Sequence, residues 1–185
     1  MKVTCPYCKR RVTIKRGEDY ICKCKNKLNY IHFFRKIINY VVYLVDANIF
    51  IYSDNKKDAR NLSCQRILKF DSPRIKIATT DVIIEEIKRN ENISVPLKMQ
   101  VYKIGRISNY LINLKTNYLK QPSNADLSLL QAAIEHPEIK GLITYDKDFG
   151  RIATKGIIEK KSCSNFWLGN AADFLRKYKI KVEVV

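Results

Sequence analysis

The chain has 185 residues, enough for one ordinary domain with a small appendage, and 46% of them are hydrophobic, which suffices for a core. Lysine and arginine number 35 against 18 aspartates and glutamates, and the resulting net charge of +17 attracts polyanions and repels other copies of the chain. Nucleic acid fits this balance better than an anionic membrane, because no long basic amphipathic helix stands out.

No segment resembles a signal peptide or a membrane span. The most apolar stretch, 37–52, is interrupted by polar residues and is too short to cross a bilayer. We therefore expect a cytoplasmic protein without a membrane partner, in which thiols stay reduced. The six cysteines then need an explanation other than disulfides.

Residues 1–39 are predicted to form a zinc-binding module and a linker. Four cysteines lie there, in Cys5-Pro6-Tyr7-Cys8 and Cys22-Lys23-Cys24. Thiolates at such spacing can share one tetrahedral Zn²⁺, and a segment so basic and so poor in aliphatic residues cannot fold by burial alone. We expect a site resembling a zinc ribbon, in which a hairpin over 11–21 brings the two pairs together. The expected ligands are Cys5, Cys8, Cys22 and Cys24.

Two alternatives stay open for these cysteines. The second pair has one intervening residue where ribbons usually have two, so His32 is a spare ligand should Cys22 or Cys24 not bind. The four thiols are otherwise free or redox-active. The isolated Cys64 falls in a helical pattern and is expected to be a small core residue.

Residues 40–185 alternate between strand and helix patterns and are predicted to form one α/β domain. In chain order, strands are expected at 40–47, 74–79, 141–145 and 180–185, and helices at 58–70, 81–89, 96–119, 124–137, 148–153 and 168–178. Thr80 or Asp81 is suited to cap the second helix, and Ser123 or Asn124 the fourth. Such alternation predicts a parallel sheet with helices on both faces.

Acidic side chains occur where these strands end and where the helices begin. Asp46 and Asp146 end two strands, while Glu86 and Asp126 lie on helices. The carboxyl edge of a parallel sheet is the place where such side chains meet, and Mg²⁺ or Mn²⁺ prefers oxygen ligands. Asp46 is the strongest candidate, because it interrupts an apolar strand, where an unpaired charge is costly.

Four short motifs in this region resemble those of the PIN-domain ribonuclease family, in the family's order. They are Val45-Asp46-Ala47-Asn48, Ile84-Glu85-Glu86-Ile87, Asn124-Ala125-Asp126-Leu127 with Ala132-Ala133 after it, and Thr144-Tyr145-Asp146-Lys147-Asp148-Phe149. The resemblance covers 40–185 and implies a three-layer α/β/α domain, metal-dependent endoribonuclease activity and a cluster of acidic ligands. With the zinc-ribbon-like module, the chain is also similar to ribosome-maturation PIN nucleases, although here the ribbon would precede the domain.

The resemblance and divalent-ion chemistry together suggest a role for each residue. Asp46 and Asp146 would hold the principal Mg²⁺ or Mn²⁺, with Asp126 completing its shell, and Glu86 would bind a second ion or orient the attacking water. The supporting residues are Asn48, which would hydrogen-bond Asp46, Asp148 as an alternate ligand, and Lys147 and Arg151, which would contact the RNA backbone. Ribosomal RNA and preribosomal particles are candidate partners.

Simpler interpretations stand beside these. In these interpretations Asp126 is a favourable first-turn charge, Asp46 is a helix cap, and Glu86 is the ion-pair partner of Lys88 or Arg89. At the level of function, the alternatives to RNA maturation are a toxin-type PIN ribonuclease, a non-catalytic RNA-binding protein and a DNA-binding regulator.

Overall fold

The computed structural model describes residues 2–4, 10–13, 19–21, 23, 27–29, 40–90, 93, 95–96, 98–116, 121–147, 149 and 166–180. Two compact units make up the chain, Met1–Tyr40 and Val41–Val185. Among the described residues, no helix has both the length and the apolar character that a bilayer crossing requires.

The first unit contains two antiparallel strand pairs. Strand β1 (Lys2–Thr4) pairs with β2 (Arg11–Thr13), and β3 (Asp19–Ile21) pairs with β4 (Lys27–Asn29). The predicted hairpin over 11–21 is therefore wrong, because β2 and β3 each pair with a different strand. The expected ligands Cys5, Cys8, Cys22 and Cys24, and the spare ligand His32, lie outside the described residues, so the zinc site stays a prediction.

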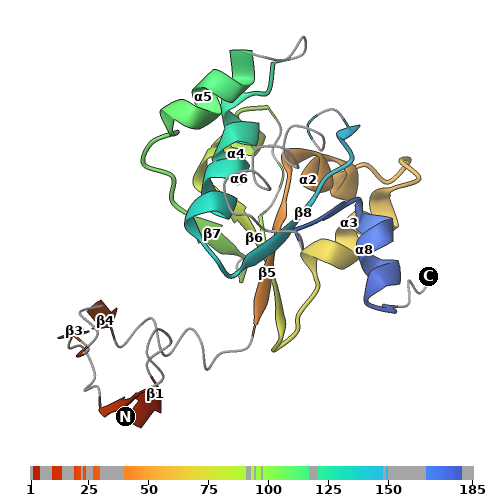
Figure 1. Ribbon diagram of the computed structural model, residues 1–185. Helices are drawn as coiled ribbons and strands as arrows, with labels where there is room; N and C mark the ends of the chain where they lie inside the picture. Colours follow the sequence, from red (N-terminus) through yellow and green to blue (C-terminus); the bar gives the residue numbers. More distant parts are fainter. Residues whose placement is uncertain are drawn as a thin grey trace. The chain divides into compact units, whose positions relative to one another are not determined.

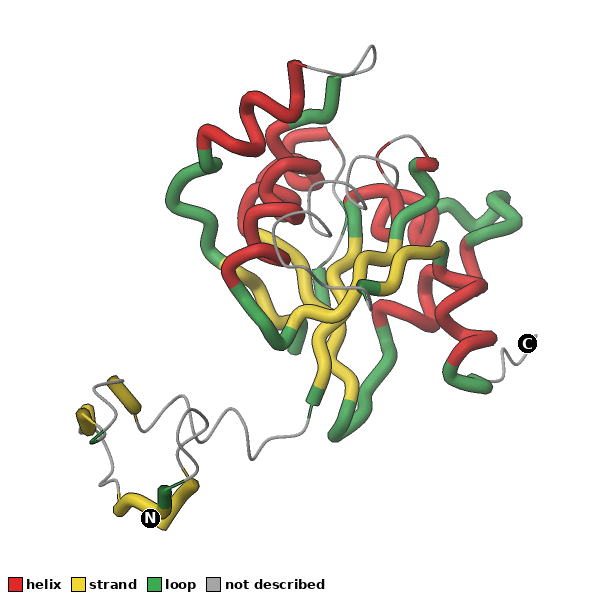
Figure 2. The backbone as a smooth tube through the Cα atoms, viewed as in Figure 1, coloured by secondary structure: helices red, strands yellow, loops and turns green. Residues whose placement is uncertain are grey.

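The second unit is built on a five-stranded, all-parallel sheet flanked by helices (Figures 1 and 2). The strand order is β7-β6-β5-β8-β9. The strands are β5 (Val41–Val45), β6 (Ile75–Thr80), β7 (Gln100–Tyr102), β8 (Ile139–Ile143) and β9 (Trp167–Gly169). The helices are α2 (Ala47–Asp54), α3 (Asn61–Leu68), α4 (Asp81–Asn90), α5 (Asn109–Thr116), α6 (Asn124–Glu135) and α8 (Ala171–Lys177).

The central strand β5 has the composition typical of a strand in a parallel sheet. Its sequence VVYLV is apolar at every position and four of its five residues are buried, as expected for a strand covered on both faces.

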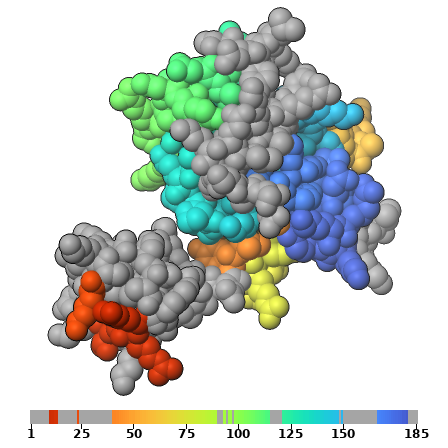
Figure 3. Space-filling view, in the orientation of Figure 1, coloured from red at the N-terminus to blue at the C-terminus, as the bar shows by residue number. Residues whose placement is uncertain are grey.

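In the view of Figure 1, α4, α5 and α6 lie on one side of the sheet, and α3 and α8 on the other. Helix α8 packs against α3, and residues 166–180 form a continuous patch on the face shown in Figure 3.

Several predicted elements of this unit are confirmed. The strands expected at 40–47 and 74–79 are β5 and β6, and the helices expected at 81–89 and 124–137 are α4 and α6. The Ser123 side chain caps α6 by accepting from the Asp126 N–H. At α4, Asp81 accepts from the Val82 N–H and Thr80 from the Ile83 N–H, so both proposed caps contribute.

Other predicted elements differ from the structure. Helix α2 was not expected, and the helix predicted at 58–70 begins only at Asn61. Its inward face carries Cys64 and Ile67, whereas Leu62 is 46% exposed. The buried Cys64 confirms the core assignment.

The predicted long helix over 96–119 is wrong, since its first part contains β7 and a loop before α5 begins. The last helix starts at Ala171 rather than at 168, because Trp167–Gly169 forms the unpredicted strand β9. The strand expected at 180–185 lies almost wholly outside the described residues, as does most of the helix expected at 148–153.

Candidate functional site

The order of the strands selects one place at the edge of the sheet. From β5 the chain passes to β6 on one side, while β8 lies on the other side of β5. Connections that leave a parallel sheet in opposite directions open a crevice at the carboxyl ends of the two strands. Asp46 directly follows β5, and Asp146 follows β8 by three residues. The Asp46 N–H still donates to the Ile143 carbonyl at 3.2 Å, which fixes Asp46 beside the end of β8.

Asp46 is a buried carboxyl held by three donors. It is 5% exposed and is the N-cap of α2, where Oδ1 accepts from the Ala47 N–H at 2.6 Å. Oδ2 accepts from Asn48 Nδ2 at 2.5 Å and from the Thr144 hydroxyl at 2.6 Å. The prediction that Asn48 orients Asp46 by a hydrogen bond is confirmed. Helix capping therefore accounts for the hydrogen bond to Oδ1 of Asp46, whereas Oδ2 is held by the side chains of Asn48 and Thr144.

Burial raises the pKa of Asp46 from its ordinary 3.8 to about 7. The hydrogen bonds from Thr144 and Ala47 lower it, while repulsion from Asp126 and Asp146 raises it further. Repulsion of this kind requires Asp126 and Asp146 each to lie within electrostatic range of Asp46. Negative charge from distant parts of the sequence therefore gathers around Asp46.

Thr144 connects the two strand ends and was not singled out from the sequence. Its hydroxyl donates to Asp46 Oδ2 and accepts from Asn48 Nδ2 at 3.1 Å and from the Asp146 N–H at 3.0 Å. The backbone N–H of Tyr145 completes the arrangement by donating to Asn48 Oδ1 at 3.3 Å. The available sequence signal was a hydroxyl residue directly after an apolar strand, two positions before an aspartate.

Glu86 and not Glu85 belongs with these carboxylates. Glu85 is exposed and pairs with Arg89 at 3.2 Å, so the ion pair considered for Glu86 is formed by its neighbour. Glu86 is partly buried, and both this burial and repulsion from Asp126 raise its pKa. Helices α4 and α6 thus bring Glu86 and Asp126 within electrostatic range of each other.

Two of the predicted ligands also hold backbone groups. Asp126 Oδ2 accepts from the Ser123 N–H at 2.7 Å and completes a capping box at the start of α6. Asp146 Oδ1 accepts from the Phe149 N–H at 2.9 Å. These bonds bear out the simpler reading of Asp126 as a helix-start charge, and they also fix where each carboxylate lies.

Asp146 does not end a strand as predicted, because β8 stops at Ile143 and Thr144 and Tyr145 lie between the strand and Asp146. Lys147 follows Asp146 and is exposed, and its contact with RNA stays a prediction. Asp148 and Arg151 lie outside the described residues, so their roles stay predictions.

The donor set suits a hard divalent cation in its chemistry. The four candidates offer carboxylate oxygens: Asp46, Glu86, Asp126 and Asp146. Asp126 repels both Asp46 and Glu86, and a bound cation would relieve this repulsion. Within the described part of the chain, however, no three histidine, cysteine or acidic side chains are arranged to hold one ion. Ion binding would therefore require side-chain adjustment or a further ligand.

A cation–aromatic cluster borders this region. The Arg60 guanidinium lies 3.4 Å from the centre of the Tyr52 ring and 5.5 Å from that of Tyr145, next to Asp146 in sequence. Asp58 holds Arg60 in a two-pronged ion pair at 2.5 and 2.7 Å. This pair fixes Arg60 in place and lowers the pKa of Asp58 to about 2. The cluster was not foreseen, since Tyr145 is distant in sequence from Tyr52, Asp58 and Arg60.

Comparison with known proteins adds no assignment: no family model, curated protein or solved structure matches the chain.

Proposed function

We propose that the chain is a metal-dependent endoribonuclease that hydrolyses RNA phosphodiester bonds. The observation that carries this proposal is the buried Asp46, which directly follows the central strand β5 and is repelled by both Asp126 and Asp146. A cluster of carboxylates at the crevice of a parallel sheet suits chemistry on phosphate esters, which commonly uses divalent cations.

In this proposal Asp46, Asp126 and Asp146 hold Mg²⁺ or Mn²⁺, and Glu86 holds a second ion or orients water. The bound ion would supply charge stabilisation for the scissile phosphate and a more acidic water. The chain's own residues then have positioning tasks. Asn48 and Thr144 aim Asp46 through the bonds described above.

We also propose that the second unit is a three-layer α/β/α PIN-like domain, that the first unit is a zinc ribbon, and that the chain acts in RNA maturation in the cytoplasm. Two features support the ribbon: β1–β2 and β3–β4 are hairpins, and the sequence between the strands of each hairpin contains one cysteine pair. The net charge of +17 supports RNA as the partner.

The test is cleavage of structured and unstructured RNA by the purified full chain with Mg²⁺, Mn²⁺ or chelator. Asp46→Asn and Asp146→Asn are expected to lower cleavage at least 100-fold. Asp71→Asn is the matched control, because Asp71 is 79% exposed and the substitution removes the same charge. Cleavage that persists in both site variants, or in chelator, would contradict the proposal.

A non-catalytic RNA-binding protein is the second candidate. It is favoured by the finding that no three described acidic, histidine or cysteine side chains form a ready metal site. Wild-type protein that binds RNA without cleaving it in any divalent ion would support this alternative. A toxin-type ribonuclease would instead cleave RNA and arrest growth when expressed.

A further inference from the structure

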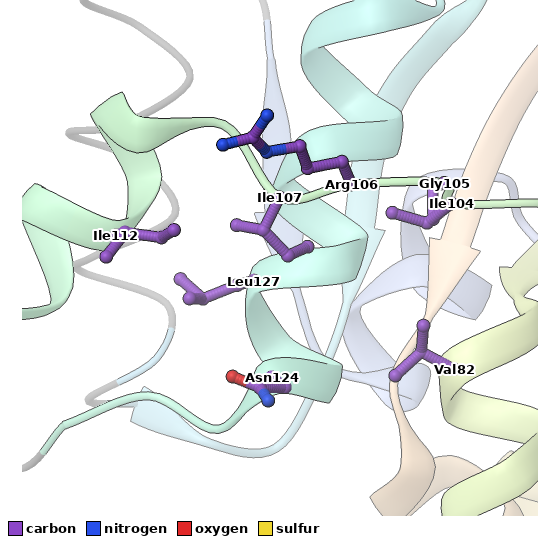
Figure 4. Close-up of a pocket in the computed structure, with 8 residues that line it drawn as sticks. All are labelled: Val82, Ile104, Gly105, Arg106, Ile107, Ile112, Asn124 and Leu127. Atoms are coloured by element: carbon purple, nitrogen blue, oxygen red, sulfur yellow. The ribbon is translucent and has the colours of Figure 1, made fainter.

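A pocket lies beside the candidate site, between α4, α5, the start of α6 and the segment 103–108 (Figure 4). Its volume is about 500 Å³, within the range of pockets that bind small ligands. Its walls are mostly aliphatic and come from Val82, Ile104, Ile107, Ile112 and Leu127. Such a hollow is large enough for a flat heterocycle and has apolar walls to receive its faces.

The polar groups of the pocket are one cation and one amide. In Figure 4, Ile107, Ile112 and Leu127 point toward one another, with Arg106 on one side of them and Asn124 on the other. Arg106 and Asn124 are both exposed, and Ile112 is 45% exposed, so the pocket opens to solvent. No carboxylate among the described residues forms an ion pair with Arg106. The pocket therefore presents positive charge at an apolar opening.

Two helices connect this pocket to the candidate carboxylates. Val82 precedes Glu86 by one turn of α4, so both lie on the same face of that helix. Leu127 directly follows Asp126 on α6. The pocket is thus lined by the same two helices that carry Glu86 and Asp126, through residues one turn away on α4 and one residue away on α6.

We propose that this pocket binds one unpaired base of the RNA substrate next to the phosphate that is cleaved. The aliphatic walls take the faces of the base, the Asn124 amide is available to its polar edge, and Arg106 neutralises the adjoining phosphate. This inference rests on the proposed ribonuclease function. It also specifies the substrate as single-stranded at that nucleotide, because a base paired in an A-form helix is not accessible to such a pocket.

Charge complementarity decides between an RNA base and a purely apolar occupant. An acyl chain or an aliphatic peptide side chain would suit the walls but would supply no counterion to Arg106. A nucleotide satisfies both features, because its base is flat and largely apolar on its faces while its phosphate is anionic. The chain's net charge of +17 favours the same ligand.

Gly105 lines the pocket and offers a position at which to narrow it. A Cβ added at Gly105 meets nothing within 4 Å, and the residue does not have a left-handed backbone conformation. Gly105→Phe therefore adds a ring at the pocket wall at unchanged net charge, and Gly105→Ala is the matched control. Thermal melting followed by circular dichroism verifies that both variants fold.

Binding is measured by fluorescence anisotropy with a short single-stranded RNA in Ca²⁺, and base burial by 2-aminopurine placed at each position in turn. Gly105→Phe is expected to weaken binding at least tenfold and to abolish the position-specific 2-aminopurine signal, whereas Gly105→Ala retains both. An RNA with an abasic site at that position should bind wild type and Gly105→Phe equally.

Arg106→Gln is compared with Lys103→Gln. Both residues are exposed on the same loop, but Lys103 does not line the pocket. The first substitution is expected to weaken RNA binding five- to tenfold and the second less than twofold. Equal losses would mean that Arg106 acts only through general charge and would overturn its assigned contact.

The outcomes separate the pocket from the proposed function. Wild-type cleavage that Gly105→Phe leaves unchanged would overturn the pocket inference and leave the ribonuclease proposal standing. Base-specific binding that Gly105→Phe removes, in a wild type that never cleaves RNA, would support the pocket and overturn the nuclease. If Gly105→Phe alters only the oligomeric state, the pocket holds polypeptide and the inference fails.

Discussion

Replacing Thr144 by valine tests whether the neighbours of Asp46 hold it as an anion. Thr144 is 6% exposed, and its hydroxyl donates to Asp46 Oδ2 at 2.6 Å while it accepts from the Asp146 N–H at 3.0 Å. The same hydroxyl accepts from Asn48 Nδ2 at 3.1 Å. Valine keeps the branched shape of threonine but has no hydroxyl, so all three hydrogen bonds are lost, and the backbone donor of Asp146 loses this acceptor.

The magnitude of the effect depends on pH because the pKa of Asp46 is raised to about 7. Above that pKa the lost bond to Asp46 is to a charged oxygen and costs about 1.5–3 kcal/mol, and the lost bonds from the Asp146 N–H and from Asn48 Nδ2 add about 1 kcal/mol each. Below it Asp46 is protonated, and each of the three lost bonds costs about 1 kcal/mol. Thr144→Val is therefore expected to lower the free energy of unfolding by about 3.5–5 kcal/mol at about pH 8.5 but only by about 3 kcal/mol at about pH 5.5.

Thr79→Val is the matched control for this measurement. Thr79 is fully buried on the neighbouring strand β6, and its hydroxyl donates to the neutral Val45 carbonyl at 3.0 Å. Its loss should cost about 1 kcal/mol at both pH values. Urea unfolding followed by circular dichroism, with chelator present throughout, gives both differences. The reasoning is refuted if Thr144→Val costs the same at the two pH values, or if Thr79→Val shows the same pH dependence.

Three further outcomes follow from the structure. Gly141→Ala should lower the free energy of unfolding by about 1–3 kcal/mol in urea, because its Cβ would stand 2.5 Å from the Trp167 carbonyl oxygen; Gly105→Ala, with an unobstructed Cβ, should change it little. Lys179→Gly should raise the melting temperature, because Lys179 follows Tyr178, the C-cap of α8, with a φ of 54° that costs a non-glycine residue about 1 kcal/mol; an unchanged or lower value would count against this. Metal-free protein should lose stability as pH rises from about 4 to about 8, because folding favours protonated Asp46, and Mg²⁺ at about pH 8 should restore stability in wild type but not in Asp46→Asn; melting curves that are flat with pH would contradict the raised pKa.

The sequence predicted the fold best where local signals agree. Strand β5 is apolar at all five positions, and the hydroxyl residues Thr80 and Ser123 contribute caps at the starts of α4 and α6. Each of these signals acts over a few residues and does not depend on distant contacts. The prediction of a parallel sheet followed from the alternation of such segments.

The sequence failed where short apolar runs are ambiguous. Ile49, Phe50 and Ile51 continue the apolar pattern of β5, although the chain has already turned into α2 at the Asp46 cap. A continuous apolar run does not distinguish a buried strand from a buried helix. Strands β7 and β9 have three residues each, too few to show a period of two.

For the site, the sequence identified the acidic residues but not what holds them. Asp46 and Thr144 are 98 positions apart, and only the pairing of β5 with β8 brings them into hydrogen-bond contact. The choice of Glu86 over Glu85 likewise depends on the side of α4 that faces α6. Such contacts depend on tertiary structure, and residue type alone does not reveal them.

The charge at position 46 is the feature that capping alone does not explain. Asparagine or serine at this N-cap would accept the same backbone hydrogen bond at the start of α2 without placing a carboxylate in the interior. At Asp46 the surroundings disfavour the ionised form, because the residue is 5% exposed and lies within electrostatic range of Asp126 and Asp146. Thr144 and Asn48 offset only part of that penalty. A cation near these carboxylates would turn the repulsion into attraction, so the arrangement is better suited to binding charge than to stabilising the fold.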